Sequence, residues 1–306
     1  ETRMIRYLLS NTDLQVKLKE TTEPETFTSN IGTPQGDSLS PVLFTIYLEN
    51  ALRNIRQPTS DSLPPELSYA DDVDFVSFTK FKDVTEIQNE LAKHYLIVNT
   101  TKTEFTLLKK SENEQWRNTK KVGSLLGDEE DVGRRKQLAN VALHKLNSIW
   151  IRSDKIKLNI RIELYRALVK SVLLYNCGTW ALTKQEEHKL DTFHRKQLRA
   201  ILNIRYPTVI TNNSLYRKTN ERPLSLTILE TRWRLFGHIL RQNPNTPGNK
   251  AMTAFFRKVG NKRKGRPKTS IVTVLRRDLK RVSKTTGLRL QTKRHLEEIR
   301  SMAQNR

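Results

Sequence analysis

The charge of this 306-residue chain is divided sharply between its two halves. Residues 1–130 hold 15 Lys and Arg against 21 Asp and Glu, a net charge of −6. Residues 131–306 hold the other 40 basic and 11 acidic residues, a net charge of +29. A field of that size can neutralise phosphates and release their counterions, which points to nucleic acid as the simplest partner. The alternatives are charge that only maintains solubility and attraction to an anionic membrane surface.

Composition narrows the class of protein further. The length allows two or three domains, and the hydrophobic share of 36% favours extensive surface over a single compact globule. The single cysteine, Cys177, excludes an internal disulfide framework and a multi-cysteine zinc site. No apolar run approaches the ~20 residues that span a bilayer, so no membrane association is expected. We expect an intracellular protein, cytoplasmic or nuclear and not secreted, whose sequence starts mid-protein because Glu1 is neither an initiator nor part of a signal pattern.

The first third of the chain alternates strand and helix patterns. Leu14 and Val16 alternate with polar residues as in a strand, and a helix is predicted after Ser40, a plausible N-cap followed by Pro41. Residues 67–78 predict two short strands around an acidic turn, followed by a helix from Val84 to Tyr95 and an apolar strand over 105–108. From residue 134 onward the apolar spacing is mostly helical. Together these patterns predict an α+β fold.

Tyr69-Ala70-Asp71-Asp72 is the strongest chemical signal. Adjacent residues of a strand point to opposite faces, so Asp71 and Asp72 can approach one metal only if a turn presents them, or else one of them is the main ligand. Mg²⁺ prefers carboxylate oxygens and often uses one or two of them together with phosphates and water. Acidic turns are common, however, and an Asp-Asp pair alone is weak evidence.

A second segment, Gly32 to Pro41, precedes this turn by one predicted helix. Gly36 allows the backbone to approach a ligand closely, and the Gln35 amide can both donate and accept hydrogen bonds. The start of the helix supplies free N–H groups suited to phosphate. Without the acidic turn, this segment would be interpreted as an ordinary loop before a helix.

Together the two motifs resemble the reverse transcriptases of non-LTR, LINE-type retrotransposons. Residues 33–44 are similar to the family's template- and nucleotide-contacting motif, and Tyr69 to Asp72 is similar to its catalytic turn. Asn99-x-x-Lys102-Thr103-Glu104 resembles the following motif, whose Lys protonates or neutralises the departing pyrophosphate. Gly123-Ser124 stands at the place of the primer-gripping hairpin. Residues 173–180, 235–241 and 264–268, with Asp278-Leu279, resemble segments of the family's C-terminal region at lower specificity.

The resemblance implies a partial polymerase palm, an antiparallel sheet with helices, over residues 1–108. A primer-grip and connection region over 109–130, a helical thumb-like domain over 131–245 and a basic tail over 246–306 follow. It also implies that Asp71 and Asp72 bind two Mg²⁺ ions and that Lys102 acts at the pyrophosphate. The template and incoming nucleotide would be contacted by Gln35, Gly36, Asp37 and Tyr69. The implied partners are an RNA template, a DNA primer, their RNA–DNA hybrid and deoxynucleoside triphosphates.

One departure from the family pattern affects the expected activity. The family's first catalytic Asp lies on a strand well upstream of Gln35, and the only Asp before Asp37 is Asp13, in a different setting. We therefore expect the chain to be a C-terminal fragment that does not extend a primer by itself. A catalytically inactive nucleic-acid-binding remnant is the main alternative. A polymerase that makes RNA on an RNA template is a third possibility, against which the Tyr-Ala-Asp-Asp form argues.

Weaker signals have simpler explanations. Lys264-Gly-Arg-Pro-Lys268 is similar to minor-groove-binding hooks, but a disordered basic tail is favoured. His188 and His194 lack the cysteines or carboxylates that would complete a metal site. Cys177 lies among apolar residues and is expected to be a buried, inert thiol.

Overall fold

The structure is a computed structural model in which the described residues are 3, 6–7, 10, 13–16, 25–28, 32–33, 36–55, 66–77, 84–108, 114–151, 153, 155–257, 269–286 and 288–305. The chain divides into two compact units, Glu1–Glu104 and Phe105–Arg306. Each unit is described by itself.

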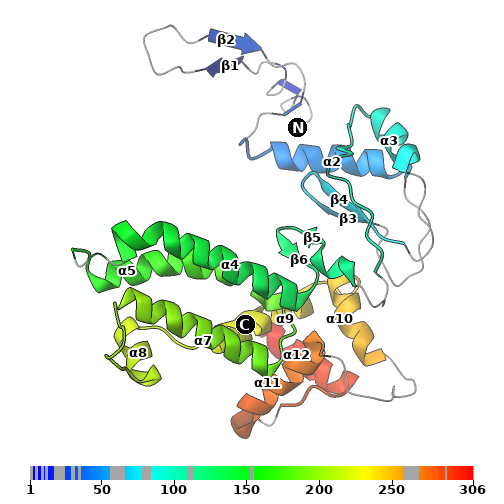
Figure 1. Cartoon of the computed structure of the whole chain (residues 1–306). Coiled ribbons are helices and arrows are strands. Elements are labelled where there is room, and N and C mark those ends of the chain that lie inside the picture. Colours follow the sequence, from blue (N-terminus) through cyan, green and yellow to red (C-terminus); the bar gives the residue numbers. More distant parts are fainter. Residues whose placement is uncertain are drawn as a thin grey trace. The chain divides into compact units, whose positions relative to one another are not determined.

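The described residues of the first unit include two antiparallel hairpins and the helices α2 and α3 (Figure 1). The first hairpin pairs β1 with β2, and the second pairs β3 with β4. The bounds of these elements are β1 Asp13–Val16, β2 Glu25–Thr28, α2 Ser40–Leu52, β3 Glu66–Tyr69, β4 Asp72–Phe75 and α3 Val84–Ala92. The two strands predicted around the acidic turn are thus β3 and β4.

The helix α2 begins one residue earlier than the sequence predicts. Leu39, not Ser40, occupies the N-cap position, and no side chain caps the first turn. Ser40 is the first helical residue and is buried. Pro41 lies in the first turn, as predicted, where its missing N–H costs no hydrogen bond.

A small apolar core holds the first unit together. It is formed by Leu48 and Leu52 of α2, Ile55 in the turn after α2 and Ile87 of α3, and Val73 and Phe75 of β4 and Leu96 pack against it. The helix α3 stops at Ala92 instead of continuing to Tyr95, because Tyr95 adopts a left-handed φ of 53°. The strand predicted at 105–108 is not formed, and Phe105, Leu107 and Leu108 are exposed.

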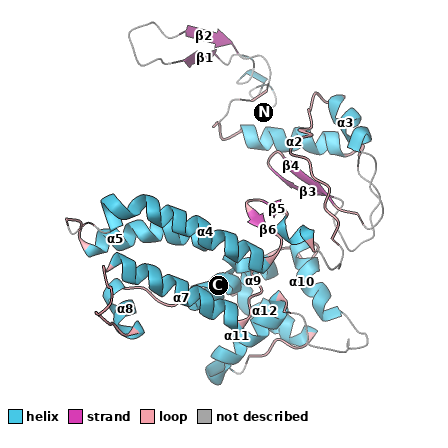
Figure 2. Ribbon diagram, in the orientation of Figure 1, coloured by secondary structure: helices cyan, strands magenta, loops and turns pink. Residues whose placement is uncertain are grey.

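The second unit is mostly helical, with strands only in one short hairpin among its described residues (Figure 2). That hairpin joins β5, Lys120–Lys121, to β6, Ser124–Leu125, after a short 3₁₀ helix over Gln115–Asn118. The remaining bounds are α4 Asp128–Leu146, α5 Leu158–Leu164, α6 Ser171–Leu173, α7 Lys184–Ile201, α8 Asn212–Thr219, α9 Leu224–Arg241, α10 Pro247–Arg257, α11 Ile271–Thr286 and α12 Lys293–Gln304. Short π-helical segments lie at Asn147–Ile151 and Tyr165–Lys170, and a 3₁₀ turn lies at Cys177–Thr179.

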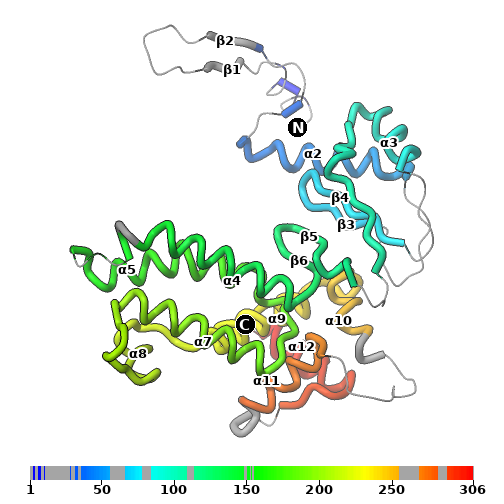
Figure 3. Tube along the Cα trace, in the orientation of Figure 1, coloured from blue at the N-terminus to red at the C-terminus, as the bar shows by residue number. Residues whose placement is uncertain are grey.

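The larger core of this unit lies among α4, α5, α6 and α7. The helix α5 continues through the π-helical segment into α6 and runs back along α4 (Figure 3). Fully buried residues of this core include Tyr165, Leu173, Leu190, Leu198 and Ile201. Cys177 is buried here as well, as predicted, and burial raises the pKa of its thiol.

The sequence analysis treats residues 246–306 as a basic tail, and the described part of this range contains the helices α10, α11 and α12. Apolar residues of α9, α11 and α12 form a second core, which contains Phe236, Leu240, Leu275, Leu279, Leu290, Leu296 and Ile299. The described part of this range is therefore both basic and folded, because its apolar residues form a stripe that packs into this core. Lys264 to Lys268 lie outside the described residues.

The observed mixture of helices and small antiparallel sheets confirms the predicted α+β class. In the part of the chain that the structure describes, no helix is both long and apolar enough to span a bilayer.

Candidate active site

The acidic turn lies at the tip of the β3–β4 hairpin. The two strands pair in the register Tyr69↔Asp72, Ser68↔Val73, Leu67↔Asp74 and Glu66↔Phe75, so Ala70 and Asp71 form a two-residue loop. Asp71 is in this loop and Asp72 is the first residue of β4. Both side chains are exposed. The turn therefore presents two neighbouring carboxylates to solvent.

The two faces of this hairpin differ in what they contact. Val73 and Phe75 pack against the helix core, so the face that carries them is directed toward α2 and α3. Because side chains alternate along a strand and directly paired residues share a face, Tyr69 and Asp72 lie on the opposite face. Tyr69 is 67% exposed there. An aromatic ring and a carboxylate are thus displayed together on the face away from the core.

The backbone at the tip of the hairpin is strained. Ala70 has a φ of 53°, a left-handed conformation that costs a residue with a Cβ on the order of 1–3 kcal/mol. Two-residue hairpin loops favour such a φ because it matches the twist of the strands, but glycine is the usual residue. The strain is concentrated at the loop that presents Asp71.

The donors at this turn fit a magnesium ion of the kind used in phosphoryl transfer. Such ions are held by one or two protein carboxylates, with the remaining positions taken by water and substrate phosphates. Asp71 and Asp72 supply that number of carboxylates, and their exposure leaves room for the other ligands. Within the described residues, no group of three or more His, Cys, Asp or Glu side chains is arranged to hold a metal ion.

The segment before α2 is described only in part. Gly32 and Gly36 have φ values of 83° and 94°, which L side chains rarely adopt, so both positions need glycine for the observed backbone. Gly36 and Asp37 are exposed and lie in the loop that leads to Ser40, the first residue of α2. Gln35, which the sequence predicts to contact the template or nucleotide, lies outside the described residues.

Lys102 lies in a tight turn stabilised by Asn99. The Lys102 N–H donates to the Asn99 carbonyl oxygen at 3.1 Å, and Asn99 Oδ1 accepts from Thr101 Oγ1 at 2.7 Å. Thr103 Oγ1 donates to the same carbonyl oxygen at 2.9 Å. Asn99 therefore orders the backbone of this motif, and the Lys102 side chain is left exposed.

Gly123 and Ser124 belong to the β5–β6 hairpin of the second unit. Val122 and Gly123 form its two-residue loop with φ values of 45° and 77°, and a positive φ at both positions is typical of a type I′ turn. The hairpin predicted in this region is therefore formed.

The β5–β6 hairpin is fastened to the helices of its own unit. The Gly123 carbonyl oxygen accepts from Arg134 Nη1 at 2.9 Å and from Arg135 Nη2 at 2.5 Å. Ser124 is 6% exposed, and its hydroxyl accepts from Arg135 Nη2 and from Asn176 Nδ2, both at 3.2 Å. Its side chain is therefore committed to holding the hairpin. The loop itself, with Val122 half exposed, is the part accessible to a partner.

One comparison with known proteins finds a similarity over the first part of the chain. Residues 2–142 match the family model of reverse transcriptase (RNA-dependent DNA polymerase). The match supports a reverse transcriptase, an enzyme family that transfers nucleotides to a primer on a nucleic-acid template. No curated protein and no solved structure matches the chain significantly.

All of the predicted site residues fall inside the reverse transcriptase match. The structure brings Tyr69, Asp71 and Asp72 together on one hairpin and places Lys102 in the same unit. Gly123 and Ser124 lie in the other unit.

The sequence analysis missed the residues that fix the β5–β6 hairpin, above all Arg135. The guanidinium of Arg135 lies 4.4 Å from the centre of the Tyr175 ring and 3.6 Å from the Asp131 carboxylate. The Asp131 and Arg135 pair at i, i+4 was the available signal, but that spacing is ordinary on exposed helices.

Proposed function

We propose that the chain is part of an RNA-directed DNA polymerase of the non-LTR, LINE-type retrotransposon kind. The observation that carries this proposal is the β3–β4 hairpin, which exposes Tyr69, Asp71 and Asp72 inside the segment matched by the reverse transcriptase model. The substrates would be deoxynucleoside triphosphates, a DNA primer and an RNA template, with the RNA–DNA hybrid as product.

Asp71 and Asp72 are the proposed metal-binding carboxylates. When bound there, two Mg²⁺ ions would activate the primer 3′-hydroxyl and stabilise the leaving pyrophosphate. The tight hairpin holds both carboxylates at a position fixed by four paired residues on each strand. A rigid carboxylate pair needs little reorganisation when a substrate arrives.

The other proposed roles follow from exposure and charge. Lys102, exposed on the turn that Asn99 orders, would neutralise or protonate the departing pyrophosphate. Gly36 and Asp37, with Gln35, would line the template and the incoming nucleotide at the start of α2, where free N–H groups suit phosphate. Tyr69 would contact the substrate beside the carboxylates. The loop at Gly123 and Ser124 would grip the primer backbone.

Primer extension tests the proposal directly. The wild-type chain and the variants Asp71→Asn and Asp72→Asn are supplied with Mg²⁺, deoxynucleoside triphosphates and a DNA primer annealed to RNA. As the sequence analysis expects, the wild-type chain should extend the primer little or not at all. Any extension that it does give should fall by on the order of 100-fold or more in either variant, because loss of a metal carboxylate removes several kcal/mol of transition-state stabilisation. Glu86→Gln, which removes an exposed carboxylate on α3 of the same unit, should leave extension unchanged.

Extension that survives both Asp substitutions would contradict the assignment of the catalytic turn. A second candidate function is a catalytically inactive nucleic-acid-binding protein, which the net charge of +29 in residues 131–306 favours. No extension by the wild type, together with salt-sensitive binding of the same primer–template, would support this second candidate instead.

A further inference from the structure

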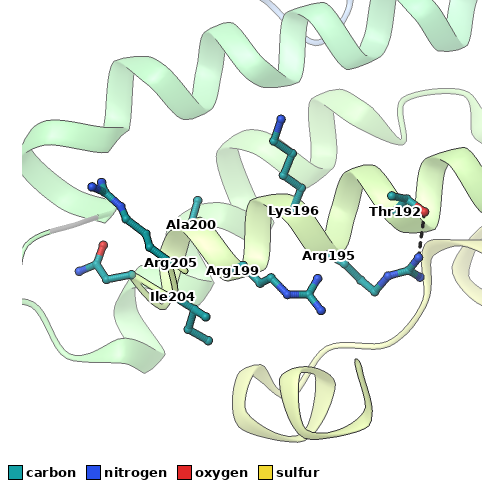
Figure 4. A pocket seen from close by; sticks show the side chains of 8 residues that line it. Thr192, Arg195, Lys196, Arg199, Ala200, Ile204 and Arg205 are labelled. Carbon is teal, nitrogen blue, oxygen red and sulfur yellow. Dashed lines mark hydrogen bonds between the residues drawn. The ribbon is translucent and has the colours of Figure 1, made fainter. Parts of the chain in front are cut away.

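The C-terminal half of α7 forms a strongly basic surface depression in the second unit. Its volume is about 390 Å³, and four of its lining residues are cations: Arg195, Lys196, Arg199 and Arg205. Thr192 and Asn203 add polar groups at its two ends. Figure 4 shows the cationic side chains spreading along and around the end of the helix instead of converging on one point. This arrangement suits an extended polyanion better than a single phosphate.

The cations of this depression are not neutralised by the protein. Among the described residues, none of the four forms an ion pair with a carboxylate. Arg195 Nη2 donates to the Thr192 hydroxyl at 2.8 Å, and Arg199 Nη2 donates to Asn212 Oδ1 at 2.9 Å. Lys196 and Arg205 are exposed. Clustered cations without counter-charges are the groups that gain most from binding phosphates.

The carboxylate on α7 nearest to these cations, that of Asp191, accepts hydrogen bonds from another helix. Asp191 lies one turn before Arg195, but its two oxygens accept hydrogen bonds from the Ser225 N–H at 2.9 Å and the Ser225 hydroxyl at 2.8 Å. It therefore anchors the start of α9 and leaves the basic cluster positive.

The end of α7 is fixed by a capping motif that also positions the last cation. Asn203 adopts a left-handed φ of 55°, the Ile204 N–H donates to the Arg199 carbonyl oxygen at 3.0 Å, and the Asn203 N–H donates to the Ala200 carbonyl oxygen at 3.2 Å. These are the bonds of a Schellman motif, which holds the following residues against the last helical turn. Arg205 is therefore held next to Arg199 by the backbone.

An exposed aromatic residue follows this cluster directly. The Thr208 N–H donates to the Arg205 carbonyl oxygen at 2.9 Å, closing a turn with Tyr206 inside it. Tyr206 is 95% exposed, and nearby Val209 is 87% exposed. An exposed aromatic ring beside a basic groove is the arrangement on which unpaired bases stack.

We propose that this surface binds a single-stranded segment of nucleic acid, with its phosphates along Arg195, Lys196, Arg199 and Arg205 and a base stacked on Tyr206. A duplex offers the same phosphates but hides the faces of its bases, so the exposed ring favours a single strand. From Thr192 to Ile201 the helix spans about 14 Å, enough for two or three phosphates. The site does not depend on the catalytic role proposed for Asp71 and Asp72.

Fluorescence anisotropy with a short fluorescein-labelled oligouridylate tests the proposal. The variant Lys196→Glu/Arg205→Glu should bind at least tenfold more weakly at low salt. Removing two phosphate contacts should also reduce the slope of log affinity against log salt by about 1.4. Tyr206→Ala should weaken binding of the single strand more than that of an RNA duplex of equal length, and Tyr206→Phe should restore it.

The matched control is Lys184→Glu/Lys189→Glu, which makes the same charge change at exposed positions of the same helix, away from the depression. It should lower affinity much less than the Lys196/Arg205 pair. Equal losses in the two double variants would overturn the site, because only overall charge would then matter. Tyr206→Ala without any effect, or with equal effects on single strand and duplex, would overturn the assignment to single strands. Asp71→Asn should leave this binding unchanged, which separates the result from the test of the catalytic turn.

Discussion

Arg232 and Asp278 form an ion pair in the interior of the second unit. Arg232 Nη1 lies 2.5 Å from Asp278 Oδ2, and their side chains are 1% and 0% exposed. Arg232 comes from α9 and Asp278 from α11, and Arg277 of α11 also binds Glu187 of α7. The pair therefore fastens the C-terminal helices to the rest of the unit.

Asp278→Ala should destabilise the protein by about 3–5 kcal/mol, because it removes the closest charge partner of the buried Arg232 guanidinium and leaves only Glu187 Oε1, at 3.9 Å. Urea unfolding followed by circular dichroism measures the change. Replacing both partners, as in Arg232→Met/Asp278→Leu, should recover much of the lost stability.

The matched control is the exposed pair Arg222 and Glu230, which has the same 2.5 Å separation but side chains that are 49% and 40% exposed. Glu230→Ala should cost about 1 kcal/mol or less, because solvent screens the pair. If Asp278→Ala costs no more than Glu230→Ala, burial is not what makes the Arg232–Asp278 pair important.

The free energy of unfolding should fall in acid because of two interacting groups, Glu221 and His194. His194 lies on α7, and Glu221 forms ion pairs with Arg166 and Lys170. Burial alone would raise the pKa of Glu221, but the His194 ring, whose Nε2 lies 3.6 Å from the carboxylate, and hydrogen bonds from Arg166 and Lys170 outweigh it and lower this pKa to about 2 from its ordinary 4.5. Burial lowers the pKa of His194 below its ordinary 6.5, against the opposing effect of Glu221.

In both cases the folded-state pKa is lower than the unfolded one, so the unfolded state binds more protons as the pH falls. The His194 contribution should begin to decline below pH 6.5, and the Glu221 contribution should be lost between about pH 4.5 and 2. The latter is on the order of 3 kcal/mol. Urea midpoints across this range measure the decline.

Glu221→Gln should be less stable at neutral pH and lose little stability below pH 4.5. The control is Glu163→Gln, at an exposed partner of Arg166, which should behave like wild type. An unchanged acid slope in Glu221→Gln would contradict the assignment.

Two glycines should respond to alanine with opposite signs. A Cβ on Gly178 would lie 3.3 Å from the Thr231 carbonyl oxygen of α9, so Gly178→Ala must displace backbone and should cost about 1–3 kcal/mol. A Cβ on Gly133, inside α4, would meet no atom within 4 Å, so Gly133→Ala should stabilise by about 0.5–1 kcal/mol. Thermal unfolding distinguishes the two. A stabilising Gly178→Ala would show that α9 can shift without cost.

The backbone strain at Ala70 should also be measurable. Ala70→Gly relieves the left-handed φ and should stabilise the β3–β4 hairpin by up to about 1 kcal/mol, whereas Ala70→Val should destabilise it by about 1–2 kcal/mol. Amide hydrogen exchange of Tyr69 and Asp72 reports on the hairpin directly. Changes in the same direction for both variants would rule out φ strain as the cause.

The acidic hairpin could be predicted from sequence because its information is local. Alternating residues on either side of Ala70 and Asp71 specify two strands and a turn, and the structure has both. The helix N-cap at Leu39 was missed by one residue, since Ser40 is the better capping residue by type. The termination of α3 before Tyr95 was missed because apolar spacing alone does not reveal a left-handed φ.

Features that depend on distant residues could not be predicted. Asp278 is one residue in a basic segment, and only the fold shows that it neutralises Arg232, 46 residues away in sequence. The basic surface that contains Lys196 and Arg205 could not be predicted because the apolar stripe dominates the sequence pattern of α7. The position of Arg205 beside this helix also depends on the capping motif at Asn203. The roles of Asp71, Asp72 and Lys102 stay predictions.

The helix α4 extends beyond the end of the reverse transcriptase match. The reverse transcriptase match ends at residue 142, but α4 continues to Leu146, and Asp131 on this helix accepts hydrogen bonds from both the Leu125 N–H and Trp180 Nε1. A recombinant fragment that ends at residue 142 would lack Trp180, the partner of the buried Asp131 carboxylate. It would also divide the larger hydrophobic core of the second unit. Expression of the helical unit as an independent piece should therefore start near residue 105, well inside the matched segment.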